Sequence, residues 1–149
     1  MTVTLFKGKL HRLRVTEADL YYEGSITIDA DLLDAAKLLP FERVQVLNVA
    51  NGARMETYTI PAPRGSRVVC MNGPAARNVA VGDQVIVIAY ADMTPEEAQA
   101  HEPRVVLVDE DNNPTHVYDL DPNAEPKYIG RYDAVASNAA GPVAATADV

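Results

Sequence analysis

Closely spaced turn signals run through the first 110 residues of the chain, and they leave room only for short strands. Asn51-Gly52 is the strongest of them, because this dipeptide favours the backbone of a tight hairpin. Alternating or continuous apolar segments lie between the turns, at residues 5–15, 25–28, 43–49, 54–60, 68–71, 84–90 and 104–108. About seven short strands favour a mainly β fold, a small closed barrel, because closure removes exposed sheet edges.

Two short helices interrupt the predicted strands. Asp29 or Asp31 can cap the first, which Pro40 ends. Its expected apolar stripe consists of Leu32, Leu33, Ala36 and Leu39. The run TPEE from Thr94 predicts a capping box at the start of the second helix. Residues 16–20 are expected to form a turn.

The periodic pattern fades after Asn112. Of the net charge of −8, −6 falls from Asp109 onward, and prolines interrupt the segment. We therefore predict a barrel domain at residues 1–111 and an acidic, Pro/Ala-rich C-terminal extension at residues 112–149, partly disordered. Some of its apolar residues could pack as an extended arm: Val117, Tyr118, Leu120, Tyr128, Ile129 and Tyr132.

Composition narrows the functional classes. Hydrophobic residues make up 48% of the chain and mean hydropathy is −0.10, which is typical of a soluble protein. The run VIVIAYA from Val85 is too short to cross a bilayer, and the N-terminus has no apolar signal segment, so the expected location is the cytoplasm, with no membrane partner. Cys70 is the single cysteine, which excludes an internal disulfide, and we expect it to pack in the core.

A basic cluster lies near the N-terminus, at Lys7, Lys9, His11, Arg12 and Arg14. Lys7, Lys9 and His11 share one face of the predicted strand. The cluster could bind a small anion or form a solvated strand face, but it is too small for a nucleic-acid footprint. The chain has no CxxC or HExxH motif and no histidine pair with ligand spacing, so no metal is expected.

Gly24-Ser25 stands where a polar turn becomes a strand. From the dipeptide alone, glycine and serine can be ordinary turn residues. Alternatively, the Ser25 hydroxyl attacks the peptide bond in front of it. Local sequence does not decide between these interpretations.

Several segments together resemble one family. They are GKLHRLRVT (8–16), ADLYYEGSITID (18–29), NGARMETY (51–58), RGSR (64–67), NGPAA (72–76) and VGDQVIVIAYA (81–91). In order and spacing they are similar to aspartate 1-decarboxylase over roughly residues 1 to 110. The resemblance implies a double-psi β-barrel and a homotetramer of cleaved α and β chains with active sites between subunits. It implies conversion of L-aspartate to β-alanine and CO2 for pantothenate and coenzyme A synthesis.

The resemblance also implies that the proenzyme cleaves itself between Gly24 and Ser25. The hydroxyl attacks the Gly24 carbonyl, and elimination leaves a pyruvoyl cofactor derived from Ser25. Glycine limits crowding at the attacked carbon and tolerates a strained backbone. Thr57 would help to hold the oxyanion.

Matching positions supply the other expected roles. Lys9 and Arg54 would bind the two substrate carboxylates, and Tyr58 would return a proton to Cα. The remaining expected substrate-binding and pocket residues are Thr57, Asn72, Gly73, Pro74, Ala75, His11 and Tyr22.

Two features bear on this assignment. Strict alternation puts Arg54 and Tyr58 on one face of a strand and Thr57 on the other, so one site needs a bulge or a subunit boundary. Pro74 has no N–H, which removes a backbone donor from the Asn-Gly loop. The sequence also leaves open a barrel module without catalysis, and the same chemistry on another amino acid.

Overall fold

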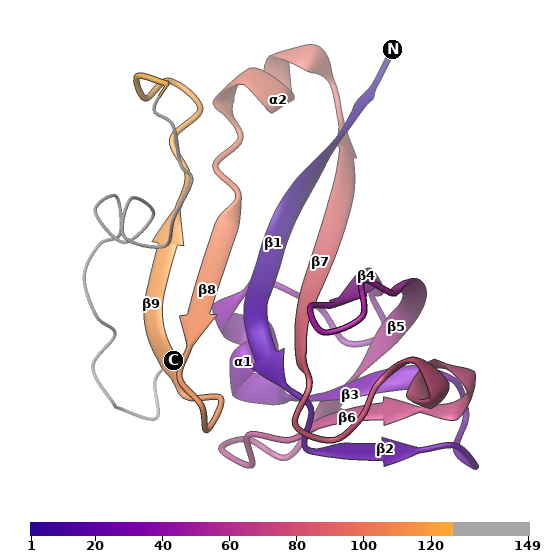
Figure 1. The fold of residues 1–149 in the computed structure, drawn as a ribbon. Helices are drawn as coiled ribbons and strands as arrows, with labels where there is room; N and C mark the ends of the chain where they lie inside the picture. Colours follow the sequence, from indigo (N-terminus) through magenta and orange to yellow (C-terminus); the bar gives the residue numbers. More distant parts are fainter. Residues whose placement is uncertain (127–149) are drawn as a thin grey trace.

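The computed structural model describes residues 1–126 (Figure 1). The expected arm residues Tyr128, Ile129 and Tyr132 and the end of the tail lie outside the described residues. The strands are β1 (Val3–Arg14), β2 (Glu17–Asp19), β3 (Ser25–Asp29), β4 (Arg43–Asn48), β5 (Arg54–Ala62), β6 (Val69–Asn72), β7 (Gln84–Met93), β8 (Arg104–Val108) and β9 (Pro114–Asp119). The helices are α1 (Ala30–Ala35), the 3-10 helix η1 (Gly73–Asn78) and α2 (Pro95–Ala100).

Six strand positions form a closed ring. β1 pairs with β7, β7 with β4, and β4 with β5, all antiparallel, while β5 runs parallel to β3 and β3 antiparallel to β6. The ring closes because the chain passes from β1 directly into β2, and β2 pairs with β6. Across this corner the Val15 N–H donates to Asp83 O (2.9 Å) and the Thr16 N–H donates to Val69 O (2.8 Å). The predicted mainly β class and closed barrel are confirmed.

Two strands flank the barrel rather than closing it. β8 runs parallel to β1, and β9 is antiparallel to β8 (Figure 1). The prediction that residues 104–108 form the last strand was wrong, because β9 follows and its Tyr118 is buried. Residues 17–19 were expected to be a turn but pair with β6 as β2. The proposed division at residue 111 stays a prediction, although β9 belongs to the same sheet as β8.

Ala36, the residue that ends α1, lies against β1 with almost no space between the two backbones. A Cβ on Gly8 would lie 2.1 Å from the Ala36 carbonyl oxygen, so only glycine fits there. Asp29 caps the helix, as predicted, by accepting from the Asp31 N–H at 2.8 Å. The predicted apolar stripe was wrong at its end: the chain leaves the helix after Ala35, so that Leu38 is buried and Leu39 is 65% exposed.

The barrel interior is filled by alternate residues of the strands. They include Leu10, Leu13, Ile26, Ile28, Val44, Val46, Val69, Met71, Val85, Val87 and Ala89. The side chains between them therefore point outward, and the candidate catalytic residues occur among those positions. The predicted capping box at Thr94 is present in α2.

Candidate active site

Ser25 is the first residue of β3 and its side chain is completely buried. Because Ile26 and Ile28 point into the core, Ser25 and Thr27 lie on the opposite, outer face of the strand. Asn72 is the direct partner of Ser25 on β6, and its Nδ2 donates to Ser25 Oγ at 2.9 Å. Ser25 Oγ in turn donates to the Glu23 carbonyl at 3.2 Å. The candidate nucleophile is thus held by two hydrogen bonds directly after Gly24.

The Asn72 amide forms hydrogen bonds with both of its polar atoms. Its Nδ2 also donates to Thr27 Oγ1 at 2.8 Å, and its Oδ1 accepts from Cys70 Sγ at 3.2 Å. Cys70 is buried, as predicted, and its thiol lies on the same face of β6 as Asn72. The spacing of two residues between Cys70 and Asn72 in a predicted strand was the sequence signal that could have placed them on one face. Burial raises the pKa of the Cys70 thiol, and the charges of Glu17 and Asp19 and a hydrogen bond with the Glu17 side chain raise it further, so the thiol keeps its proton.

The tightest backbone contact of the site is at Gly73. Its φ is +64°, and a Cβ there would lie 2.7 Å from Tyr22 O and 2.8 Å from Gly24 Cα. Gly24 itself is not in the left-handed region, and a Cβ there would meet Pro74 Cδ at an ordinary 3.6 Å. The expectation of a strained backbone at Gly24 was therefore wrong. The position that requires glycine is Gly73, which directly follows the neighbouring strand β6.

Pro74 is compatible with this loop. Asn72 is the N-cap of η1 and the proline falls in the first turn, where a helix leaves N–H groups without intrahelical partners. The N–H that proline lacks is therefore one that the helix does not need. Ala75 follows it and packs partly buried against the core.

β5 carries three further candidate residues on two faces. It pairs with β4 without a bulge from Arg43↔Tyr58 to Leu47↔Arg54. Arg54 and Tyr58 therefore lie on the outer face, and Thr57 lies on the inner face opposite Val44, as alternation predicted. A bulge does not explain their joint use. The β3–β5 register begins at Ile26↔Thr59, and one residue earlier it sets Ser25 beside Tyr58.

Lys9 and His11 occupy a different part of the outer surface. β1 is separated from β5 by β7 and β4 in the strand order. With about 4.8 Å between neighbouring strands, the backbones of β1 and β5 are about 14 Å apart along the sheet. Arg54 Nη1 donates to Gln45 Oε1 at 2.8 Å. Within a single chain, the strand order therefore separates the backbone of Lys9 from the backbones of Ser25 and Tyr58.

Burial and neighbouring positive charges lower the pKa values of basic groups around Lys9. Burial lowers the pKa of Lys9, whose Nζ lies 5.8 Å from the centre of the Phe6 ring. The pKa of His11 falls to about 4, first because of burial and then because of the positive charges of Lys9 and Arg12. His11 is therefore neutral at pH 7. Lys7, which shares the segment, is paired with Glu42 at 2.8 Å.

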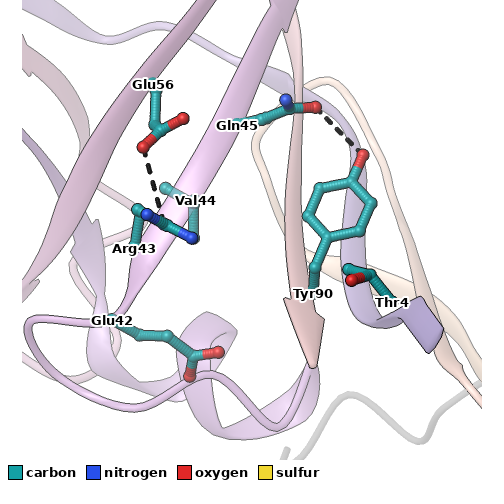
Figure 2. A pocket seen from close by; sticks show the side chains of 7 residues that line it. All are labelled: Thr4, Glu42, Arg43, Val44, Gln45, Glu56 and Tyr90. Carbon is teal, nitrogen blue, oxygen red and sulfur yellow. Dashed lines mark hydrogen bonds and ion pairs between the residues drawn. The ribbon is translucent and has the colours of Figure 1, made fainter. Parts of the chain in front are cut away.

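A hollow of about 560 Å³ lies on the outer face of the barrel beside these strands (Figure 2). It is lined by Thr4, Glu42, Arg43, Val44, Gln45, Glu56 and Tyr90. Gln45 Oε1 accepts from the Tyr90 hydroxyl at 3.0 Å, and Arg43 faces Glu56 at 3.5 Å. Gln45 accepts a hydrogen bond from Arg54, and Arg43 is opposite Tyr58, so the hollow adjoins one candidate substrate-binding residue and one candidate catalytic residue without being lined by Ser25.

Residues 1–126 contain neither a metal-binding cluster nor a membrane-spanning helix. No cluster of three or more His, Cys, Asp or Glu side chains is placed to hold a metal ion in that part of the chain. None of its helices has the length and apolar character needed to span a membrane.

Comparison with known proteins identifies the family. A family model described as aspartate decarboxylase matches residues 1–115. The chain belongs to this family. The aspartate 1-decarboxylase of Salinibacter ruber is 67% identical over 121 residues, covering 81% of this chain and 83% of that protein. The Chloroherpeton thalassium enzyme of the same name is 53% identical over 127 residues, covering 85% and 93%.

A third relative, aspartate 1-decarboxylase of Desulfitobacterium hafniense (strain DSM 10664 / DCB-2), is 59% identical over 114 residues, covering 76% of this chain and 90% of that protein. The predicted resemblance is confirmed, and so is the prediction that the chain is an enzyme, a carboxy-lyase of the aspartate 1-decarboxylase family.

Proposed function

We propose that this chain cleaves itself between Gly24 and Ser25, and that the resulting pyruvoyl enzyme converts L-aspartate to β-alanine and CO2. This reaction would supply pantothenate synthesis in the cytoplasm. The observation that carries the proposal is the buried Ser25 hydroxyl, held by Asn72 and the Glu23 carbonyl, at a glycine–serine bond in a member of this family.

The cleavage uses groups of the chain and one water molecule. Ser25 Oγ adds to the Gly24 carbonyl carbon, the C–N bond breaks, and the hydroxyl proton passes to the Ser25 nitrogen, which gives an ester. Loss of the Ser25 Cα proton and breakage of the Cβ–O bond then release Gly24 as a carboxylate. Water replaces the nitrogen of the remaining unsaturated residue as ammonia and leaves a keto terminus. Thr57 would stabilise the charge on the Gly24 oxygen.

The remaining site residues act on the substrate. Lys9 and Arg54 supply the two cations that the two carboxylates of L-aspartate require. Tyr58 lies beside Ser25 in the strand register and would return a proton to the substrate Cα. The pyruvoyl group supplies an electron-accepting carbonyl, which is the chemistry that loss of an α-carboxylate requires. Tyr22, His11, Asn72, Gly73, Pro74 and Ala75 would complete the pocket.

A site shared between subunits is supported by the separation of β1 from β5 in the sheet. The backbones of β1 and β5 are about 14 Å apart along the sheet, no bulge in β5 shortens this distance, and only the long side chains of Lys9 and Arg54 reduce it. In an oligomer, Lys9 of a neighbouring subunit would supply the cation that lies far from Ser25 within one chain. We therefore propose a homotetramer with inter-subunit sites.

Mass spectrometry of the purified chain tests the cleavage. We expect a fragment ending at Gly24 and a larger fragment whose blocked terminus reacts with borohydride. Ser25→Ala should stay whole and inactive. The chain offers a matched control at its second glycine–serine bond, Gly65-Ser66, where Ser66→Ala should cleave normally because Ser66 is exposed. An intact wild-type chain that decarboxylates aspartate would contradict the proposal.

A further inference from the structure

The hydrogen bonds around Ser25 have a defined direction. Cys70 donates to Asn72 Oδ1, Asn72 Nδ2 donates to Ser25 Oγ, and Ser25 Oγ donates to the Glu23 carbonyl. With its proton on that carbonyl and one lone pair accepting from Asn72, Ser25 Oγ keeps one lone pair for attack on the carbonyl carbon of Gly24.

The orientation of the Asn72 amide decides whether this chain of donors is possible. Ser25 and Thr27 do not fix it, because a hydroxyl can donate or accept and would satisfy either end of the amide. The Cys70 thiol is different, since it donates to oxygen but accepts only weakly from an N–H. A flipped amide would set its NH2 group against sulfur and its oxygen against Ser25. With its single proton donated to Asn72 Oδ1 rather than to the neighbouring Glu17 side chain, Cys70 is the group that distinguishes the two orientations.

We propose that Cys70 is a positioning residue for self-processing, acting through Asn72 to keep the NH2 group of the amide toward Ser25 Oγ. This inference rests on the proposed cleavage between Gly24 and Ser25. Cys70 does not touch the reacting atoms, and its effect is on the fraction of chains in which Ser25 is correctly held. The thiol is placed for this by β6, where Cys70 and Asn72 are two residues apart and share one face.

Cleavage kinetics of freshly purified precursor test the proposal. Cys70→Val keeps the volume and removes the donor, so we expect cleavage to slow roughly tenfold, the effect of losing about one hydrogen bond. Cys70→Ser supplies an O–H donor to the same oxygen and should cleave within about twofold of wild type. A purely packing role predicts the opposite order, because valine fills the site and serine does not.

A double variant tests the route through Asn72. In an Asn72→Ala background, changing Cys70 to Val should cause no further slowing, because the amide that it orients is absent. Thermal unfolding accompanies each variant, and Cys70→Ala is used in place of Cys70→Val if the latter does not fold. Equal cleavage rates of wild type and Cys70→Val, or additive slowing in the double variant, would overturn the proposal. Absence of cleavage in wild type would instead refute the proposed function.

Discussion

Gly73 is the residue near the proposed cleavage bond that is least able to accept a larger side chain. Gly73→Ala would place a Cβ within 2.8 Å of Gly24 and Tyr22 backbone atoms at a φ of +64°, and those atoms must move. We expect cleavage of the 24–25 bond to slow at least tenfold and the free energy of unfolding to fall by about 2 kcal/mol. Gel analysis of freshly made precursor measures the first effect and urea denaturation the second.

Gly52→Ala is the control for this variant. Its φ is +73° but nothing lies within 4 Å of the new Cβ, so it should lose about 1 kcal/mol of stability and cleave at the wild-type rate. If Gly73→Ala cleaves as fast as Gly52→Ala, the close approach at Gly73 has no role in processing.

His11 provides a pH-dependent prediction. Its folded-state pKa of about 4 lies below the ordinary 6.5, so between these pH values the unfolded chain binds a proton that the folded chain does not. The contribution of His11 to the free energy of unfolding is therefore zero at pH 7 and becomes unfavourable as pH falls from about 6.5 toward 4. Because the ring is partly exposed, we expect a loss of about 1 kcal/mol.

Urea denaturation at pH 7, 5.5 and 4 checks this prediction at a fixed protein concentration. His11→Gln removes the titrating group and should lose less stability on acidification than wild type. An identical loss in both proteins would mean that His11 does not hold a depressed pKa.

Side-chain faces could be predicted at the residue scale, but contacts between distant segments could not. Alternation alone placed Arg54 and Tyr58 opposite Thr57, and the regular β4–β5 register confirms it. The need for glycine at position 73 was not predicted, because the constraint arises where residues 22–24 meet residue 73. The hydrogen bond of Cys70 to Asn72 was not predicted, because a free cysteine most often packs in the core and its sequence neighbours do not show which side chain it meets.

The contact between β1 and Ala36, the residue that ends α1, is a testable feature at the scale of elements. In Gly8→Ala the new methyl group would overlap the Ala36 carbonyl oxygen, which is backbone and cannot rotate away. We expect the helix to separate from the strand and the free energy of unfolding to fall by at least about 2 kcal/mol. Urea denaturation beside Gly65→Ala, where the Cβ meets nothing, measures the effect; equal stability of the two variants would contradict it.

Elements with strong local signals were predictable, and elements formed mainly by pairing were not. Asn51-Gly52 and the Thr94 capping box specify their hairpin and helix from adjacent residues. β2 is three exposed residues, and β9 has only Tyr118 buried, so neither shows the apolar alternation of a strand. Each exists because a partner strand, β6 or β8, offers its free edge.

At the scale of the whole molecule, the separation of Lys9 from Ser25 can be tested by mixing inactive chains. Ser25→Ala cannot form the keto group but keeps Lys9, and Lys9→Ala cleaves but lacks the substrate cation. If the site combines two subunits, co-expression of the two variants places an intact Lys9 against a processed terminus in about a quarter of sites. We expect about that fraction of wild-type β-alanine production, from two variants that are each inactive alone.

Size-exclusion chromatography with light scattering establishes that mixed oligomers have formed in this experiment. Ser25→Ala co-expressed with Tyr58→Ala is the comparison, because Tyr58 adjoins Ser25 within one chain by the β3–β5 register. In that pair the processed chain lacks its own tyrosine, so activity should not return. Recovery with Lys9→Ala but not with Tyr58→Ala would assign Lys9 to the neighbouring subunit. No recovery in mixed oligomers of either pair would place Lys9 in the site of its own chain, and the outer face of β1 would then have to approach Ser25 by a change in the barrel itself.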